Sequence, residues 1–526
     1  MRIRQKSLQI LEERALDKER KEDALQGPAK ELSQEDIAAS LVQIEDYEFP
    51  FENLIFEGGG NKGTSYVGCL QCLEDIGLVS QIKRFAGSSI GSITAALIAL
   101  GYTSSEIDGY MSKNKEDMIF DHSFGYLSLL PNLLKDFGWN PGNGIYKWFG
   151  DMIQRKSAVG NPDMTFLDLY KERKKELCVV VTNVNQMREE YCHIKTTPNM
   201  PIRDALRMSM AIPGVFAAIF HQNNGERDIY VDGGVVCSYP LHCFDGWYLS
   251  MSPDDTFLQK IAPLSNLHNI MLERFREKNL KSLGFLLYDD SELEVIRFKL
   301  EKRVGSTEPQ KPRVETKLYK QWLHKMKRST NAMEEHGRVV EAFDAFMKAL
   351  RKHSLVDKEF ISEKDLADAL QDKDVFHEEY SDLLFGPNIS VDKAFQMLDK
   401  DSNGQISFIE LLQFIEAHGI KMQAKFQGSR RTEVKNLSQF FSAVGNTLMS
   451  NLAYLFLKEN DEDRTVGINT GHIQTLDYTL ETADKEFVIQ RGYNATKAFL
   501  QYYVVQNPQT KKKPRTDTMN QPIKEN

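Results

Sequence analysis

The chain has 526 residues, of which 41% are hydrophobic and 27% are charged. This length fits one large domain with extra modules, or three ordinary domains, and the hydrophobic share excludes a wholly disordered protein. Asp and Glu outnumber Lys and Arg by 75 to 66, and the resulting net charge of −9 argues against nucleic acid as the main partner.

Cysteine content and hydropathy indicate the compartment. Six cysteines are too few for a disulfide framework in a chain of this length, and Cys69 and Cys72 lie in an apolar periodic run, so we expect buried free thiols in a reducing compartment. No stretch reaches the roughly 18 consecutive apolar residues of a membrane-spanning helix, and the N-terminus lacks the apolar core of a secretory signal. We therefore expect a cytoplasmic or peripheral membrane protein, and both a protist enzyme and a bacterial effector delivered into a host cell remain open.

Strand and helix patterns alternate early in the chain. Residues 1–45 form a charged segment with few large apolar residues. After it, short apolar runs at 53–57 and 81–86 each end in glycine and are followed by helical periodicity at 64–76 and 92–100. A strand, a glycine turn and a helix repeated at this spacing predict a parallel α/β sheet.

The α/β pattern is interrupted once. Further strands are predicted at 176–183, 229–232, 283–288 and 464–469. Residues 305–427 are helical and charged, which marks a second module. A long helix is predicted at 437–457, and residues 506–526 are polar, basic and broken by proline, so we expect them to be disordered.

A glycine run at residues 58–63 lies where the first strand passes into a helix, and it satisfies the G-x-G-x-x-G fingerprint of dinucleotide sites. A nicotinamide site also needs an acidic residue about 20 residues further on, at the end of the next strand, to bind the ribose. That strand carries Lys83 and Arg84 and no acid. The dinucleotide interpretation is therefore rejected.

The second strand ends in G-x-S-x-G at residues 87–91, which places Ser89 at the apex of a strand-to-helix turn. Such a turn needs glycines because there is no room for Cβ atoms beside the exposed hydroxyl. The following helix directs its N–H groups and positive dipole end at whatever is attached to Ser89. We therefore predict that Ser89 is a nucleophile.

Two further features complete a hydrolase site. Backbone N–H groups of Gly59, Gly60 and Asn61 are candidates to stabilise the oxyanion that forms when Ser89 attacks a carbonyl. Asp232 stands at the end of a predicted strand, where a partly desolvated carboxylate can accept the serine proton directly. Taken alone, Asp232 is better explained as a turn aspartate, but the three features in this order, each at a strand end, favour a site.

Together these motifs resemble the patatin-like phospholipases, which are lipid acyl hydrolases with a Ser–Asp dyad. The resemblance rests on residues 57–63, 87–91 and 232–234 and on the S-x-A-x-P pattern within residues 207–216. It implies a three-layer α/β/α domain with a mainly parallel sheet, Ser89 as nucleophile and Asp232 as general base. The resemblance continues at residues 437–457 and 464–500, which look like the closing helix, strand and terminal helix of the same domain. It therefore implies a domain of 50–304 and 428–505 into which residues 305–427 are inserted. It also implies an oxyanion loop of Gly58, Gly59 and Gly60, supported by Lys62, Gly63, Gly87, Gly91, Gly233 and Gly234. Lys62 is either the basic companion of that loop or a solvated cation.

Within the insertion, residues 399–410 fit the twelve-residue calcium loop of an EF-hand. Oxygen side chains fall at positions 1, 3, 5 and 9, glycine at position 6 permits the bend, and Glu410 at position 12 can chelate with both oxygens. The expected Ca2+ ligands are Asp399, Asp401, Asn403, Gln405 and Glu410. The alternative is a loop of the same shape whose metal is absent or structurally irrelevant.

EF-hands usually occur in pairs, and residues 354–365 resemble a degenerate partner loop without metal. Val356 and Lys358 stand where ligands belong, and Ile361 falls where it can pair with Ile406. We therefore expect an inserted all-α EF-hand pair with one Ca2+ site of regulatory or structural purpose.

The main functional expectation is a phospholipase of the A type that acts on glycerophospholipids at a membrane surface through a Ser89 acyl-enzyme. No cofactor is needed for ester hydrolysis, and the sequence identifies no protein activator. Two alternatives remain: an α/β-hydrolase with a Ser-His-Asp triad that uses His221, His242 or His472, and a catalytically inactive calcium-responsive binding protein. The aromatic residues at about 120–150 either pack in the core or contact acyl chains.

Overall fold

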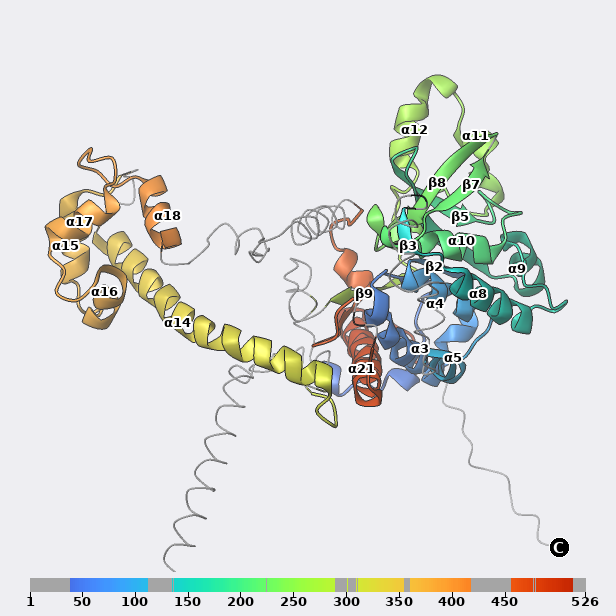
Figure 1. The fold of residues 1–526 in the computed structure, drawn as a ribbon, viewed down its shortest axis with the longest axis horizontal. Helices are drawn as coiled ribbons and strands as arrows, with labels where there is room; N and C mark the ends of the chain where they lie inside the picture. Colours follow the sequence, from blue (N-terminus) through green and yellow to red (C-terminus); the bar gives the residue numbers. More distant parts are fainter. Residues whose placement is uncertain are drawn as a thin grey trace, which may run out of the picture. The chain divides into compact units, whose positions relative to one another are not determined.

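The structure is a computed structural model that describes residues 38–111, 135, 137–223, 225–288, 300, 309, 311–353, 360–417, 456–475, 477 and 479–513. These residues divide into two compact units. The larger unit contains the described residues up to Tyr319 and from 456 onward, and the smaller unit contains those from Lys320 to 417 (Figure 1). The predicted boundaries at 305 and 427, the segment 1–37 and most of the predicted helix 437–457 lie outside the described residues.

The larger unit is built on an eight-stranded sheet with the order β10-β9-β1-β2-β4-β8-β7, and β5 is also paired with β4. The strands are β1 (Asn53–Phe56), β2 (Arg84–Ser88), β4 (Glu176–Asn183), β5 (Arg188–His193), β7 (Ile219–Asn223), β8 (Glu226–Asp232), β9 (Ser282–Tyr288) and β10 (Thr465–Asn469). The five strands from β10 to β4 form four parallel pairs, whereas β5 and β8 run antiparallel to β4. The predicted mixed α/β fold with a mostly parallel sheet is therefore confirmed.

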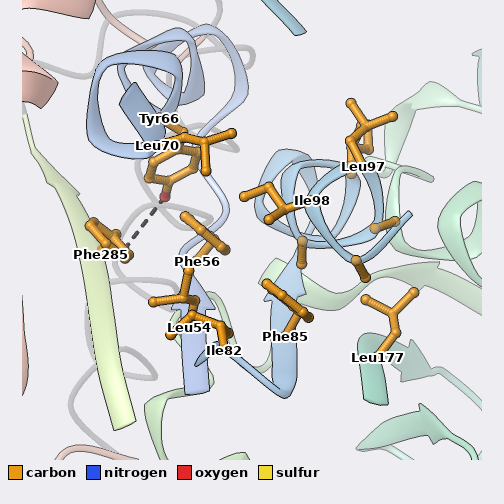
Figure 2. Packing of buried hydrophobic residues seen from close by; sticks show 14 of the residues in the cluster. Leu54, Phe56, Tyr66, Leu70, Ile82, Phe85, Leu97, Ile98, Leu177 and Phe285 are labelled. Atoms are coloured by element: carbon orange, nitrogen blue, oxygen red, sulfur yellow. Dashed lines mark hydrogen bonds between the residues drawn. The ribbon is translucent and has the colours of Figure 1, made fainter. Parts of the chain in front are cut away.

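Both faces of the sheet are buried. Successive strand residues point to opposite sides, so the apolar strands contribute side chains to a core on each face. Figure 2 shows Leu54, Phe56 and Phe85 on one face, packed under side chains of α3 (Tyr66–Asp75) and α4 (Ile90–Ala99). On the other face, Ile55, Ala86, Cys178 and Val180 pack against η6 (Leu241–Phe244) and adjoining loops. Within the described residues, long helices therefore cover one face, and short turns cover the other.

Further elements surround the sheet. They are α5 (Ser104–Met111), α8 (Asn143–Lys156), α9 (Phe166–Arg173), α10 (Ile202–Ser209), α11 (Phe257–Lys260) and α12 (Leu267–Glu273), with a two-stranded sheet of β3 (Gly138–Asn140) and β6 (Gly214–Phe216). Of the predicted aromatic segment, Phe149 is buried, whereas Phe137 and Trp139 are about half exposed. Phe124 and Tyr126 lie outside the described residues. All six cysteines are buried and free, as predicted.

The C-terminal part of the chain completes the larger unit. β10 adds to β9 in parallel, and α21 (Thr482–Gln506) packs against α3 so closely that a Cβ on Gly492 would lie 2.0 Å from Ser65 O. The start of the predicted disordered tail is ordered, because Lys512 pairs with Tyr47 and Lys513 N–H donates to Asp46 O at 2.7 Å. The structure thus differs from the prediction over residues 507–513.

The smaller unit is helical. It comprises α14 (Lys317–His353), which begins in the larger unit, and α15 (Glu363–Gln371), α16 (Glu378–Phe385), α17 (Val391–Leu398) and α18 (Phe408–Ala417). Phe346, Phe376, Leu366 and Ile406 are in its own hydrophobic core. A separate core is what an independent module requires.

Candidate active site and metal-binding loop

The register of the sheet brings the predicted nucleophile and base together. β4 pairs with β5 on one edge, so β2 and β8 share the other edge. β2 ends with Ser88 opposite Val180, and β8, running the other way, ends with Asp232 opposite Val181. The two strands therefore meet end to end at neighbouring positions of β4, and Ser89 follows directly after Ser88.

Ser89 occupies a strained turn. Its φ of 50° and ψ of −129° are rare for a residue with a side chain, and it stands at the N-cap of α4. A Cβ on Gly87 would lie 2.3 Å from the carbonyl carbon of Gly91, and a Cβ on Gly91 would lie 2.3 Å from Phe56 O. Both glycines are thus required by close backbone contacts that hold the turn.

The side chains predicted to be the nucleophile and the base are hydrogen-bonded to each other. Ser89 Oγ donates to Asp232 Oδ2 at 2.7 Å, and both residues are buried, with 6% and 4% exposure. Gly234 N–H donates to the other carboxylate oxygen at 2.7 Å. Burial raises the pKa of Asp232 to about 7, although these two hydrogen bonds oppose the shift. A carboxylate with this pKa can exchange a proton near neutral pH.

Gly58 and Asn61 are not free to bind an oxyanion. Gly58 N–H donates to Ser238 O at 3.0 Å, and Asn61 N–H donates to Thr475 O at 3.1 Å. These bonds remove both residues from the predicted set of donors. A Cβ on Gly58 would lie 3.1 Å from Ser89 Cβ, so this glycine instead makes room for the nucleophile.

The remaining predicted donors are the N–H groups of Gly59 and Gly60, between these two occupied amides. Gly60 has a φ of +54°, and a Cβ there would lie 2.1 Å from Thr475 O. Gly63 approaches Ile90, the first residue of α4, with 2.7 Å between its ideal Cβ and Ile90 Cγ1. Lys62 is only 3% exposed, which does not fit a solvated cation.

Gly233 and Gly234 form η5 (Gly233–Val235) directly after the base. A Cβ on Gly233 would lie 2.2 Å from Val180 O, so only glycine allows the chain to turn this close to β4. Gly234 supplies the N–H that fixes the carboxylate.

Ser209 contacts Ser89, and the sequence analysis assigned no role to Ser209. Its Oγ accepts the Ser89 N–H at 2.9 Å and donates to Val180 O at 2.7 Å, and its side chain is fully buried. Ser209 therefore ties the strained turn to β4. The neighbouring Met210 places its Sδ 3.8 Å from Ser89 Oγ. The signal that pointed to them was the S-x-A-x-P pattern.

The three histidines considered for a triad have other surroundings. His242 Nε2 is hydrogen-bonded to Tyr191 Oη at 2.7 Å, and burial lowers the pKa of His242 to about 3. His472 Nε2 is 2.7 Å from Asp484 Oδ1. The His221 ring packs edge-on against Tyr230. The direct contact between Ser89 and Asp232 thus has no imidazole between them.

The loop between α17 and α18 gathers acidic groups in the smaller unit. Carboxylate oxygens of Asp399, Asp401 and Glu410 lie within 4.8 Å of one another. The bend passes through Gly404, which has a φ of +81° and donates its N–H to Asp399 Oδ2 at 3.0 Å. Hard oxygen donors arranged in this way fit Ca2+, so the residues present suit the predicted metal.

The other predicted ligands lie in the same loop. Asn403 Nδ2 donates to Asp401 Oδ2 at 2.9 Å, and Gln405 N–H donates to Asn403 Oδ1 at 2.8 Å. Ile361 and Ile406 exchange two backbone hydrogen bonds, of 3.0 and 2.9 Å. Positions 354–359 of the predicted partner loop, which include Val356 and Lys358, lie outside the described residues.

Comparison with known proteins shows what part of the larger unit is similar to. Residues 54–245 match the model of the patatin-like phospholipase family, so this part of the chain is similar to that family. No helix in the part of the chain that the structure describes is long and apolar enough to cross a bilayer.

Individual relatives are similar over the same domain. The uncharacterized protein YqhO of Bacillus subtilis (strain 168) is 31% identical over 36% of this chain and 65% of its own length. The probable lipid hydrolase 463L of Invertebrate iridescent virus 6 is 28% identical over 36% of this chain and 62% of its own. The chain thus spans just under two thirds of these relatives. The crystal structure of VipD from Legionella pneumophila aligns with 86% of this chain and 67% of its own at 15% identity, with a TM-score of 0.37.

Proposed function

We propose that the protein is a lipid acyl hydrolase of the phospholipase A type, in which Ser89 and Asp232 act as a dyad. The observation that carries this proposal is the 2.7 Å hydrogen bond between Ser89 Oγ and Asp232 Oδ2 in a buried site. The patatin-like domain and a relative described as a probable lipid hydrolase support a lipid ester as substrate.

The reaction follows from this contact. Asp232 accepts the hydroxyl proton while Ser89 Oγ bonds to the ester carbonyl carbon, and the carbonyl oxygen becomes an oxyanion near the N–H groups of Gly59 and Gly60. When the carbon–oxygen ester bond breaks, the leaving alcohol takes the proton from Asp232, and the acyl group stays on Ser89. Water then gives a proton to Asp232 and attacks the acyl carbon. When the bond between this carbon and Ser89 Oγ breaks, Asp232 returns the proton to Ser89 Oγ, which releases the fatty acid and restores the serine hydroxyl.

The test is acyl release from phosphatidylcholine by wild type and Ser89→Ala, together with labelling by a fluorophosphonate probe. We expect the wild type to release fatty acid and to be labelled on Ser89, and the variant to do neither. Ser80→Ala is a matched control, because Ser80 is an exposed serine whose hydroxyl bonds only locally, to Gly77 O. Fatty acid release by Ser89→Ala at the wild-type rate would rule out the proposal.

We also propose that residues 399–410 bind Ca2+ through the side chains of Asp399, Asp401, Asn403 and Glu410. Gln405, at position 7 of the loop, is the fifth ligand. The cluster of three carboxylates supports this proposal, because several carboxylate oxygens within this short distance are the hard ligands that Ca2+ prefers. Titration of the chelator-treated chain with Ca2+ in a calorimeter should give one saturable site. Lack of heat and an unchanged melting temperature would exclude it.

A further inference from the structure

One part of the larger unit exposes apolar side chains to an unusual extent. Residues 247–274 leave the sheet region after η6 and contain α11 and α12, and the three short helices from 257 to 273 bury none of their residues. The most exposed large side chains are Leu258 (86%), Leu264 (69%) and Leu272 (70%). Figure 1 shows α12 projecting from the edge of the larger unit near α11. We call residues 247–274 the apolar arm.

The base of the apolar arm is fixed. Trp247 N–H and Tyr248 N–H both donate to Arg274 O, at 3.2 and 3.3 Å, so the two ends of the arm close on each other. Lys195 Nζ donates to Trp247 O at 2.9 Å and to Asp255 O at 2.7 Å. The hydrogen bonds therefore fix the base of the apolar arm, while its tip stays exposed. A loosely attached loop would lack these bonds at its base.

The tip carries no formal charge. Residues 261–272, IAPLSNLHNIML, contain no Asp, Glu, Lys or Arg, although ten of these twelve residues are exposed. Charges at the flanks are partly paired within the protein: Lys260 with Asp255 at 2.9 Å, and Arg274 with Glu189 at 2.7 Å. Moving this tip out of water therefore requires no desolvation of an ion.

The arm is attached at the same end of β4 as the dyad. Arg274 binds Glu189, which is the register partner of Thr182 on β4, and Thr182 Oγ1 donates to Asp232 O at 2.9 Å. The dyad itself is buried, so a lipid must leave its bilayer to reach Ser89. An apolar element anchored near this end of the sheet is placed to hold the domain on the surface that supplies the substrate.

We infer that the tip of the apolar arm inserts into the interfacial region of a phospholipid bilayer. This inference rests on the proposed lipid hydrolase function for the identity of the surface. Because the tip is uncharged, attachment is driven by apolar burial and does not require anionic lipid. Each exposed leucine contributes roughly tenfold or more to the partition coefficient when it is buried.

The experiment uses the full chain with Ser89→Ala, so that hydrolysis plays no part in the readout. Cosedimentation with phosphatidylcholine vesicles should show binding, and the added double substitution Leu264→Asp, Leu272→Asp should reduce the partition coefficient by at least tenfold. Val159→Asp is the matched control, because Val159 is an 80% exposed apolar residue outside the arm, and it should bind as before.

A second measurement reports the tip directly. Because the six native cysteines are buried, Leu264→Cys provides a thiol that an environment-sensitive fluorophore can label selectively. Its emission should shift to shorter wavelength on addition of phosphatidylcholine vesicles. An unshifted emission, binding that appears only with anionic vesicles, or dimerisation that the aspartate pair abolishes would each overturn the inference. Bound vesicles with no fatty acid release by wild type would instead contradict the proposed function and leave the arm assignment intact.

Discussion

Two carboxyl groups, Asp232 in the larger unit and Glu410 in the smaller, have pKa values that are shifted in opposite directions. Within the described part of the chain, Asp232 accepts hydrogen bonds from the Ser89 hydroxyl and the Gly234 N–H, and burial raises its pKa to about 7. Glu410 receives more donors, and these lower its pKa to about 2. Its donors are the backbone N–H groups of Lys400, Asp401 and Ser407 and the hydroxyl of Ser407.

The balance between lost hydration and donated hydrogen bonds therefore decides the direction of the pKa shift: loss of hydration is the largest contribution at Asp232, whereas hydrogen bonds from Ser407 are the largest at Glu410. A general base must gain and lose a proton near the working pH, which suits the sparsely bonded Asp232. A calcium ligand must stay ionised while a cation comes and goes, which suits the well-bonded Glu410. The same side-chain chemistry thus serves two purposes.

The largest expected effect comes from removing the sparsely bonded carboxylate. Asp232→Asn keeps the shape but cannot accept a proton from Ser89, so ester hydrolysis should fall by about 10²–10⁴-fold. Initial rates with a soluble short-chain ester measure this without a lipid surface. Asp151→Asn, an exposed change on α8, is the control. Near-wild-type rates for Asp232→Asn would show that another group is the base.

A smaller effect is expected on the well-bonded side. Glu410→Gln removes the charge at the last position of the loop, so Ca2+ affinity should fall by at least about tenfold. Calorimetric titration of the variant gives the dissociation constant. Glu378→Gln, at an exposed position in the first turn of α16, should bind Ca2+ like the wild type. Equal affinities for both variants would place the metal elsewhere.

The raised pKa of Asp232 also predicts two pH effects. Hydrolysis should decrease about tenfold per pH unit below pH about 7, because only the ionised carboxylate is a base. The free energy of unfolding should change in the opposite direction. A carboxyl group whose pKa is raised in the folded state stabilises the fold most at pH values below its unfolded pKa. This contribution is lost as the pH rises through about 7. Asp232→Asn should therefore melt at a higher temperature than wild type at pH 8, and the difference should shrink by pH 5. A rate that stays constant from pH 5 to 8 would contradict the assignment.

The sequence predicted the strands and the residues of the candidate site, but it did not predict the hydrogen bonds between distant segments. Glycine spacing, the serine turn and the strand ends predicted the sheet and which residues would face the site. The sequence could not show that Ser238 O and Thr475 O occupy the N–H groups of Gly58 and Asn61, because these partners lie far away along the chain. Nor could alternation of apolar residues reveal that β8 is antiparallel and meets β2 end to end, since strand direction depends on the path of the connecting segments.

Ser209 allows the turn at Ser89 to be tested separately from the two carboxylates, because it binds the backbone N–H of Ser89. Ser209→Ala leaves the buried Ser89 N–H without its acceptor, which costs roughly 1–3 kcal/mol of stability. The strained turn then relaxes, so we expect the rate of fluorophosphonate labelling to fall by up to about tenfold, with the pH dependence unchanged because Asp232 keeps its surroundings. Labelling rates across pH 6–9 separate the two quantities, and Ser80→Ala provides the reference. A shifted pH profile in Ser209→Ala would mean that Ser209 tunes the base and does not simply hold the turn.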